Sequence, residues 1–415
     1  MIRKAVLFLF VFFLAILMIA CQDERLQQPL FQYSMNNPAD SGSRYPNIYV
    51  DNTGKMYLSW LVPIEEDIAT VQYSTYKNER WTLPKTVHID TDFFVNWADF
   101  PSVVGYEGTE VAAHWLRKVE GGPYAYDVQI SFFDEDRNRW GEAIKPHLDM
   151  TATEHGFVSL EPIDSDKVLA VWLDGRETAG RADDEYSDTS KSMTLRSAEI
   201  SRSGEITNSQ IIDGTVCDCC QTDLAKTDDG FVVVYRGRTA EEIRDIKIAH
   251  YNTDSGTWSE PVTVHDDGWQ IMACPVNGPR VVANGNQVAV VWYTGEGDNP
   301  RVSVATSADG GQTFGDPVEM PESESRVLGR ADLVIGDDGS VYVSWMQEFE
   351  GSGYIMMAEV GPDGTVSDEQ TVGITDASRT SGFPRIALVD DSLVFAWTQT
   401  DPIVRLRTAK VDLEP

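Results

Sequence analysis

A short β-rich strand that ends in an aromatic residue recurs seven times along the chain. The repeats are marked, at intervals of 52 to 63 residues, by Trp60, Trp115, Trp172, Tyr235, Trp292, Trp345 and Trp397. A second β-rich run precedes each of these strands, and a third strand and a polar turn follow it. Helical periodicity is absent. This period is typical of propeller blades built from four antiparallel strands, so the sequence predicts an all-β, seven-bladed β-propeller. Six blades is the alternative if one repeat is a degenerate insertion.

The last repeat reaches Pro415 without an outer strand. Residues 29–34 alternate in polarity and could supply that strand, which would close the ring and remove the sheet edges. We therefore expect one propeller domain over residues 44–415, preceded by a polar tether over residues 21–43.

The first residues resemble a bacterial export signal. A basic start is followed by an unbroken apolar run over residues 5–20 and then by Cys21. Met18-Ile19-Ala20-Cys21 resembles a lipobox, which predicts a signal peptide over residues 1–20 and a lipid on Cys21. An ordinary signal peptide and a transmembrane anchor are the alternatives. We expect an exported protein that is lipid-anchored in the cell envelope, on the periplasmic side or at the cell surface.

The charge balance restricts the class of partner. The chain has 66 acidic and 33 basic residues and a formal net charge of −33. Such a field repels nucleic acids and anionic membrane surfaces, so we expect no nucleic-acid partner and membrane contact only through the lipid anchor. We expect a monomer.

One turn carries the signature of a family. Residues 307–314, Ser-Ala-Asp-Gly-Gly-Gln-Thr-Phe, fit the Asp-box pattern Ser-x-Asp-x-Gly-x-Thr-Trp/Phe, and residues 252–258 are a degenerate copy. The aspartate of such a turn can accept bonds from turn amides, and glycine adopts the positive φ that the turn needs. With this box in phase with seven repeats, the chain resembles the sialidase-like, Asp-box (BNR-repeat) β-propeller superfamily over about residues 44–415. The resemblance implies that the boxes are structural and lie away from the active site.

Strand direction locates the functional face. In a propeller the innermost strand of each blade begins, and the second strand ends, at one mouth of the central channel. Arginines recur at these positions although the chain is acidic, and acids and aromatics are interleaved with them: Arg44, Trp97, Glu154, Asp174, Arg176, Arg236, Arg238, Arg330 and Arg379. Salt bridges between blades are one interpretation. The other, which we adopt, is a pocket for an acidic glycan or another anionic small ligand, with Arg44, Arg236, Arg238, Arg330, Asp174 and Arg176 as its binding residues.

The resemblance also implies a set of catalytic residues. Sialidases bind the substrate carboxylate with three arginines and use a tyrosine nucleophile paired with a glutamate, with an aspartate as acid/base. Arg44-Tyr45-Pro46 resembles the family's Arg-Ile-Pro signature, and Asp67 falls in the loop that carries the family's aspartate. After Arg330, Tyr354 is the only tyrosine near a loop. The nucleophile pattern is incomplete, so an exo-sialidase-like glycoside hydrolase remains one hypothesis beside a non-catalytic role.

Four cysteines fall at the innermost-strand starts of two adjacent repeats, so we expect them to lie close together. They are Cys217, Cys219, Cys220 and Cys274. Export favours disulfides, and four cysteines allow three pairings, of which Cys217–Cys274 with a vicinal Cys219–Cys220 is one. The alternatives are free thiols or a thiolate-bound metal, with His155 as an extra ligand. No cofactor is assigned.

The cysteine runs extend the resemblance. Cys-Asp-Cys-Cys-Gln-Thr at 217–222 and Cys-Pro-Val-Asn-Gly-Pro at 274–279 together resemble a subgroup of exported sialidase-like proteins. Ordinary sialidases lack these runs. The second functional hypothesis is therefore a non-catalytic scaffold, or a metal- or redox-binding propeller, that uses the cysteine cluster at the same mouth.

Overall fold

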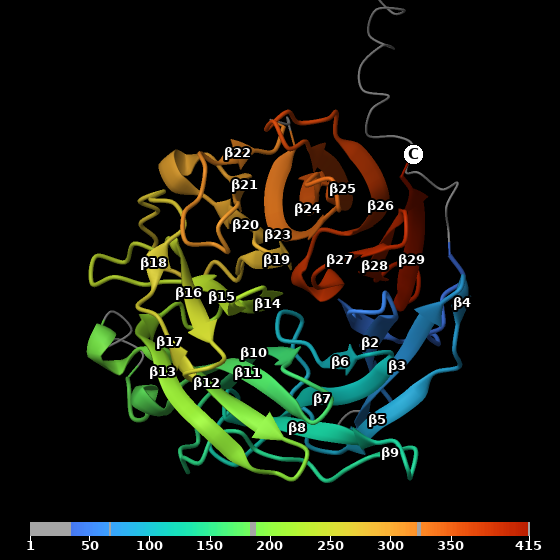
Figure 1. Ribbon diagram of the computed structural model, residues 1–415, viewed down its shortest axis with the longest axis vertical. Helices are drawn as coiled ribbons and strands as arrows, with labels where there is room; N and C mark the ends of the chain where they lie inside the picture. Colours follow the sequence, from blue (N-terminus) through green and yellow to red (C-terminus); the bar gives the residue numbers. More distant parts are fainter. Residues whose placement is uncertain (1–34, 66–67, 183–187, 322–324, 414–415) are drawn as a thin grey trace, which may run out of the picture.

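The computed structural model describes residues 35–65, 68–182, 188–321 and 325–413. Over these ranges the chain forms seven antiparallel sheets that are arranged in a ring, with the strands of each sheet following one another in sequence order from the centre outward (Figure 1). The prediction of an all-β propeller with seven blades is confirmed. Within the same ranges no helix is long and apolar enough to cross a membrane.

The first four blades run from the N-terminal side through the middle of the chain. Blade 1 contains β1 (Arg44–Val50), β2 (Met56–Pro63), β3 (Ala69–Lys77), β4 (Arg80–Trp81) and β5 (Lys85–Asp90). Blade 2 contains β6 (Ser102–Tyr106), β7 (Thr109–Lys118), β8 (Tyr126–Asp134) and β9 (Arg139–Trp140). Blade 3 contains β10 (His155–Pro162), β11 (Lys167–Asp174), β12 (Met193–Ser201) and β13 (Ile206–Val216). Blade 4 contains β14 (Asp223–Thr227), β15 (Gly230–Arg236), β16 (Ile246–Asn252), β17 (Thr257–Trp258) and β18 (Val262–Thr263).

Three further blades complete the ring. Blade 5 contains β19 (Arg280–Asn284), β20 (Gln287–Thr294), β21 (Arg301–Ser307) and β22 (Val318–Glu319). Blade 6 contains β23 (Arg326–Ile335), β24 (Val341–Phe349), β25 (Ser352–Val360) and β26 (Gln370–Asp376). Blade 7 contains β27 (Arg385–Val389), β28 (Ser392–Gln399) and β29 (Arg405–Asp412). The described helices are single 3-10 turns: η2 (Arg176–Thr178), η4 (Thr189–Lys191), η5 (Glu296–Asp298) and η6 (Arg379–Ser381).

The aromatic residue of each second strand packs between blades. Trp60, Trp292 and Trp345 are among the largest fully buried side chains, and every residue of β15 is buried. A second strand has sheet neighbours on both sides and other blades against both faces, so its residues can be apolar without interruption. This explains why the repeat is visible in the sequence as Val-, Ala- and Trp-rich runs.

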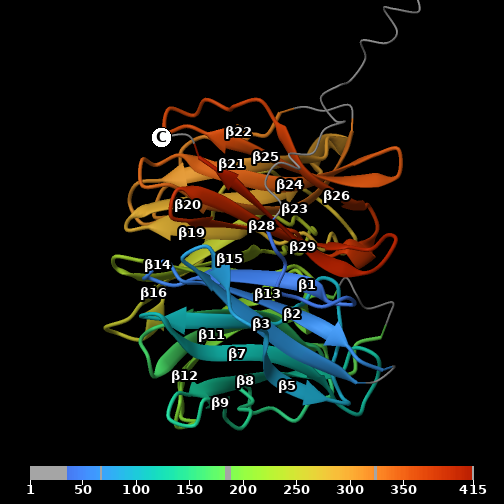
Figure 2. The same cartoon turned by 90° about the vertical axis from the view of Figure 1, so that its right-hand side faces the viewer.

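The ring closes where blade 7 meets blade 1. In the side view, β1 and β2 lie between β28 and β29 of blade 7 and β7 of blade 2 (Figure 2). Near the outer edge of blade 7, the amide of Met35 donates to the carbonyl of Thr408 in β29 at 3.3 Å. The predicted closing strand, residues 29–34, lies outside the described residues.

The Asp-box lies at the end of β21, and because β21 begins at the channel mouth, the box is at the opposite end of its blade. Asp309 accepts hydrogen bonds from the hydroxyl of Ser307 at 2.7 Å and from the amide and hydroxyl of Thr313 at 2.9 and 2.6 Å. The bonds from Thr313 and Ser307 lower the pKa of Asp309 to about 2. The box therefore stabilises a turn, and its carboxylate is already engaged.

Candidate functional site at the channel mouth

The innermost strands surround a central cavity of about 720 Å³. Its polar wall includes Arg280, which contacts Asp223 at 3.1 Å and Asp332 at 3.2 Å. At the mouth the cavity is narrowed by Gln221, whose side-chain amide donates to the carbonyl of Ala98 at 2.8 Å and whose Oε1 accepts from the amide of Gly278 at 2.9 Å. These bonds connect blades 2, 4 and 5 across the channel.

Three innermost strands contain a non-glycine residue in the left-handed region within their first five residues. These residues are Tyr45 (φ 57°), Phe157 (φ 52°) and Arg330 (φ 51°), and each lies in a register shift of its strand pair. Such β-bulges redirect side chains and store backbone strain, and both features concentrate near functional sites. At these three positions of the mouth, the bulge therefore redirects a side chain of the innermost strand.

An aromatic–arginine cluster, made of Trp97, Phe383, Arg330 and Arg379, occupies one side of the mouth. The rings of Trp97 and Phe383 stack at 5.6 Å with an interplanar angle of 17°. The guanidinium carbons of Arg330 and Arg379 lie 5.2 and 5.7 Å from the centre of the Trp97 ring. Trp97 is partly exposed and Arg379 is exposed, so the cluster presents an aromatic surface and positive charge to solvent.

Arg330 is held by neutral groups. Its guanidinium donates to the hydroxyl of Ser381 at 2.8 Å and to the carbonyls of Gly382 and Ser378 at 3.0 Å each. Burial lowers the pKa of Arg330 to about 10; the charge of Asp376 opposes this, and those of Arg379 and Arg326 reinforce it. Among the described residues, neither Arg330 nor Arg379 forms a salt bridge, so their positive charge is not paired by contact.

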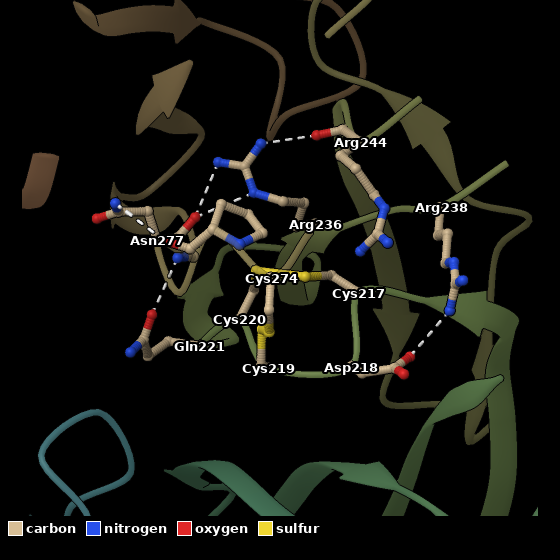
Figure 3. Close-up of a disulfide and its surroundings, with 12 residues drawn as sticks. Cys217, Asp218, Cys219, Cys220, Gln221, Arg236, Arg238, Arg244, Cys274 and Asn277 are labelled. Atoms are coloured by element: carbon tan, nitrogen blue, oxygen red, sulfur yellow. Dashed lines mark hydrogen bonds and ion pairs between the residues drawn. A yellow bond between two sulfur atoms is a disulfide. The ribbon is translucent and has the colours of Figure 1, made fainter. Parts of the chain in front are cut away.

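The blade 4 arginines are in a different situation. Arg236 is buried, and its guanidinium donates to the carbonyls of Asn277 at 3.0 and 2.8 Å, Arg244 at 2.6 Å and Tyr293 at 2.7 Å (Figure 3). Arg238 contacts Glu242 at 2.6 Å and Asp218 at 3.3 Å. These two predicted substrate-binding arginines thus connect parts of the protein, and their contact with a ligand stays a prediction.

A pair of carboxyl groups lies on the same side of the mouth, at blades 2 and 3, where Asp99 follows Trp97 by two residues. The hydroxyl of Tyr126 donates to Oε1 of Glu154 at 2.6 Å, and the amide of Phe157 donates to Oδ2 of Asp99 at 2.7 Å. Burial raises the pKa of Glu154 to about 7 and that of Asp99 to about 8. Glu154 is partly exposed, so it can hold or release a proton near neutral pH at a position that solvent reaches.

Asp174 and Arg176 form a bidentate pair at the end of β11. Nε of Arg176 donates to Oδ1 of Asp174 and Nη2 donates to Oδ2, each at 2.7 Å. Asp174 is fully buried and Arg176 is partly exposed. The structure brings His155 to this pair: its Nε2 lies 3.6 Å from Oδ1 of Asp174.

The remaining predicted residues are spread around the ring. Arg44 begins β1 and donates from Nε to the carbonyl of Gly42 at 3.4 Å. Tyr354 is part of β25, where its ring packs against Phe349 at 6.5 Å. Asp67 lies outside the described residues. The catalytic assignment of Asp67 and Tyr354 therefore stays a prediction.

The four cysteines form two disulfides, Cys217–Cys220 and Cys219–Cys274 (Figure 3). Their Cα atoms lie 5.8 and 6.1 Å apart, within the usual range for disulfides. The pairing with a vicinal Cys219–Cys220 bond, which the sequence offered as one arrangement, is not the one formed. The turn over residues 217–220 brings its first and last cysteines together and directs Cys219 to the loop before β19.

The two disulfides differ in exposure. Cys217 and Cys220 are buried, whereas Cys274 is exposed and Cys219 is partly exposed. The Cys219–Cys274 bond connects the start of blade 4 to the start of blade 5. His155 lies instead in a separate group with Asp127, His147, Asp149 and Asp174.

Two groups at the mouth were not selected from the sequence. The sequence placed Trp97 and Arg379 at the mouth but did not predict that they contact each other. That contact depends on how the loops before β6 and β27 fold. His147 and Asp149 lie in a segment before β10 with no strand pattern. The only related sequence pattern was that Trp97 and Arg379 flank the starts of innermost strands.

Comparison with known proteins supports the fold. Residues 229–395 match the family described as BNR repeat-like domain. No curated protein matches the chain in sequence. A protein of unknown function from Dyadobacter fermentans is 12% identical with a TM-score of 0.50, and the alignment covers 92% of this chain and 97% of that one.

Two glycan-active proteins are among the similar structures. An ulvan lyase of polysaccharide lyase family PL25, bound to -[GlcA(1-4)Rha3S]-, is 14% identical with a TM-score of 0.52, over 92% of this chain and 94% of that one. A mutant of the NanB sialidase from Streptococcus pneumoniae is 9% identical with a TM-score of 0.48, over 92% of this chain and 70% of that one. At these identities the similarity concerns the fold.

Proposed function

Because this chain is a seven-bladed β-propeller of which residues 229–395 match the BNR repeat-like family, we propose that it binds acidic glycans at the channel mouth and processes them there. The observation that carries the proposal is the aromatic–arginine cluster. An aromatic face can stack on the apolar face of a sugar ring, and the exposed guanidinium of Arg379 beside it can bind a carboxylate or sulfate.

The negative charge of the whole protein should direct anionic ligands to this cluster and away from the rest of the surface. In a chain of net charge −33, anionic ligands are repelled by most of the surface. Arg330 and Arg379, which make no salt bridge among the described residues, provide local attraction at one place. The ulvan lyase with a similar fold is bound to a glycan that contains a uronic acid and a sulfated sugar, which is the ligand class that we propose here.

Glu154 is the residue that we propose for proton transfer. With a pKa of about 7, raised by burial, it is partly protonated at neutral pH and can donate a proton to a glycosidic oxygen. The Tyr126 hydroxyl, 2.6 Å from Oε1, fixes the orientation of the carboxyl group.

Binding is tested by calorimetry with acidic and neutral oligosaccharides of matched length. The acidic set contains sialylated, uronate-containing and sulfated members. We expect the protein to prefer acidic members, and Trp97→Ala to reduce that affinity at least about tenfold, as for a central aromatic contact. Trp81→Ala, in the outer part of blade 1, is the control, and a thermal melt verifies that both variants fold. If no acidic glycan binds, or if the two variants behave alike, the proposal is wrong.

Turnover is tested separately with the glycan that binds most tightly. We expect sugar release that Glu154→Gln abolishes while affinity is retained, because the amide oxygen can still accept from Tyr126. Unchanged turnover in Glu154→Gln would exclude Glu154 as the acid. Absence of turnover in the unmodified protein would leave a glycan-binding protein.

We further propose that the protein acts from the cell envelope, held by a lipid on Cys21. Cys21→Ser should move the protein from the membrane fraction to the soluble fraction and abolish incorporation of labelled fatty acid. Retention of the label in the variant would contradict this assignment.

A further inference from the structure

Two histidines, His147 and His155, are stacked inside the mouth face between blades 2 and 3. Their ring centres lie 3.9 Å apart with an interplanar angle of 4°, and both side chains are fully buried. Three aspartates surround them: Asp127 from β8, Asp149 from the segment before β10 and Asp174 from β11. Imidazoles and carboxylates concentrated in this way can hold a proton or a metal ion.

The hydrogen bond of His155 decides which ring nitrogen carries a lone pair. Nδ1 lies 3.2 Å from the backbone carbonyl of Tyr126, which can only accept, so Nδ1 carries the hydrogen. In neutral His155, Nε2 is then an acceptor. This buried atom has no hydrogen-bond partner among the described residues, yet it lies 3.1 Å from Oδ2 of Asp149 and 3.6 Å from Oδ1 of Asp174.

Three acceptor atoms therefore face one another in a buried place. Arg176 lies 3.3 Å from Oδ1 of Asp149 and binds Asp174, and Arg196 lies 3.8 Å from Oδ1 of Asp174, so the carboxylates have cationic partners at one side. None of these contacts reaches Nε2 of His155, and a positive charge between the three atoms would satisfy it. We propose that this charge is a divalent transition-metal ion, bound by Nε2 of His155, Oδ2 of Asp149 and Oδ1 of Asp174.

The separations of these atoms fit one ion. All three lie within 4.8 Å of one another. Ligand atoms about 2.1 Å from an ion are roughly 3.0 Å apart in octahedral geometry and roughly 3.4 Å apart in tetrahedral geometry. The observed 3.1 and 3.6 Å are close to these values.

Hydrogen bonds from surrounding groups orient the three atoms, as they orient the ligands in metal sites. The bond from Nδ1 of His155 to a backbone carbonyl is the arrangement expected for a metal-bound histidine. His147 contacts Oδ1 of Asp149 through Nδ1 at 2.9 Å, and the Thr151 hydroxyl donates to Oδ2. Trp172 donates to Oδ2 of Asp174 at 2.9 Å, and Arg176 binds both oxygens of that carboxylate.

The ligand set indicates the class of ion. One imidazole with two carboxylates suits Zn²⁺ or Mn²⁺ better than Ca²⁺ or Mg²⁺, which prefer oxygen-only sites. The site is closed to solvent apart from the edge of Asp149, so the ion would fasten residues 147–155 to the end of β11. Glu154 lies within this segment, and the ion would therefore fix the carboxyl group proposed for proton transfer.

The first experiment measures metal in the full chain, purified without chelator, without reductant and with a tag that contains no histidine. We expect one Zn²⁺ or Mn²⁺ per chain by mass spectrometry, and no free thiol by thiol titration, so that the cysteines cannot account for the ion. Removal by chelator should lower the melting midpoint. Addition of Zn²⁺ or Mn²⁺ at about 100 times its Kd should raise it by roughly 3–6 °C.

Variants locate the ion. Asp149→Asn and His155→Ala should lose it, whereas His265→Ala should retain it, because that exposed histidine pairs with Asp267 elsewhere. Should His155→Ala fail to fold, Asp149→Asn still tests the site, since Asp149 is partly exposed in a loop. A Co²⁺-substituted sample should show visible absorption bands that the Asn variant lacks.

Three results would overturn the proposal. One is the absence of bound metal together with no thermal shift from Zn²⁺ or Mn²⁺. Another is an equal shift from Ca²⁺ or Mg²⁺, which would exclude the transition-metal assignment. The third is a nitrogen NMR spectrum in which both ring nitrogens of His155 carry hydrogen in the untreated protein, because a proton would then occupy the position proposed for the ion.

Discussion

The arginines of blade 4 and those around Trp97 differ in what their guanidinium groups contact. Arg236 donates to three backbone carbonyls and Arg238 contacts two carboxylates, so the donors of both are used within the protein. Arg330 is likewise buried and donates to Ser381, Gly382 and Ser378. Arg379 differs, because its guanidinium is exposed beside Trp97 and forms no salt bridge among the described residues. The same residue type at the same mouth thus stabilises the protein at Arg236, Arg238 and Arg330 and presents an exposed charge at Arg379.

The difference shows that position at the mouth does not by itself identify a ligand-binding arginine. What matters is whether the protein already satisfies the guanidinium. The disulfides reinforce the contrast, because both lie on the blade 4 and blade 5 side, where Cys219–Cys274 connects the two blades. That side is fixed by covalent bonds and hydrogen bonds, and the side of Trp97 is where we propose that a ligand binds.

The largest effect is expected from Arg236→Met. The substitution leaves the carbonyls of Asn277, Arg244 and Tyr293 without this donor in a buried place, which should reduce the free energy of unfolding by about 3–5 kcal/mol. Urea denaturation measures it. Arg117→Met, at an exposed pair with Asp92, is the control and should change stability by less than about 0.5 kcal/mol. A stable Arg236→Met protein would abolish the distinction between the two groups of arginines.

The two disulfides should differ in their contribution to stability. Cys219–Cys274 closes a loop with a sequence separation of 55, and its loss should destabilise by about 4 kcal/mol in the chain-entropy account. Cys217–Cys220 has a separation of 3, which corresponds to about 2 kcal/mol. Paired Cys→Ser variants, compared in urea without reductant, measure both. A larger loss from the short loop would show that the entropic argument does not govern this region.

The fold could be predicted because the apolar second strand of each blade recurs in the sequence at a regular interval. Each second strand is apolar on both faces, so Trp60, Trp292 and Trp345 mark the blade period directly. The Asp-box turn was also readable, since Ser307, Asp309 and Thr313 bond one another locally.

The site was less predictable because its contacts join distant segments. The cysteines were correctly expected to lie together, but their pairing depends on the direction in which the turn at 217–220 points each side chain. His155 was considered as an extra ligand for a metal ion bound by the cysteines, since these residues all lie at innermost-strand starts. The structure turns it instead toward Asp149 and Asp174, and no sequence spacing encodes that direction.

Asp99 provides a test of the Trp97 side through pH. Burial raises its pKa to about 8 from 3.8, while the bond from Phe157 opposes this and the charge of nearby Glu154 adds to it. The folded state therefore retains a proton that the unfolded state releases. Stability from this group is fully present below pH 3.8 and is lost as the pH rises to about 8, by up to about 1.4 kcal/mol per pH unit.

Asp99→Asn cannot ionise, so its stability should vary less with pH in that window. Chemical denaturation at several pH values compares it with Asp134→Asn, which lies in an outer turn beside Arg137. Equal pH dependence in the two variants would show that Asp99 does not keep its proton in the folded state.

The smallest effect on stability, and the most informative one, is expected from Arg379→Gln. Because Arg379 is exposed and makes no salt bridge among the described residues, its substitution should change the free energy of unfolding by less than about 0.5 kcal/mol. Loss of a charged partner should reduce the affinity for an acidic glycan about 5–10-fold at low salt, and less at high salt, where the charge is screened. Calorimetry at two salt concentrations measures this, with Arg137→Gln as the control. An equal loss for a neutral glycan would mean that Arg379 acts by supporting the Trp97 ring, because charge attraction distinguishes ligands and ring packing does not.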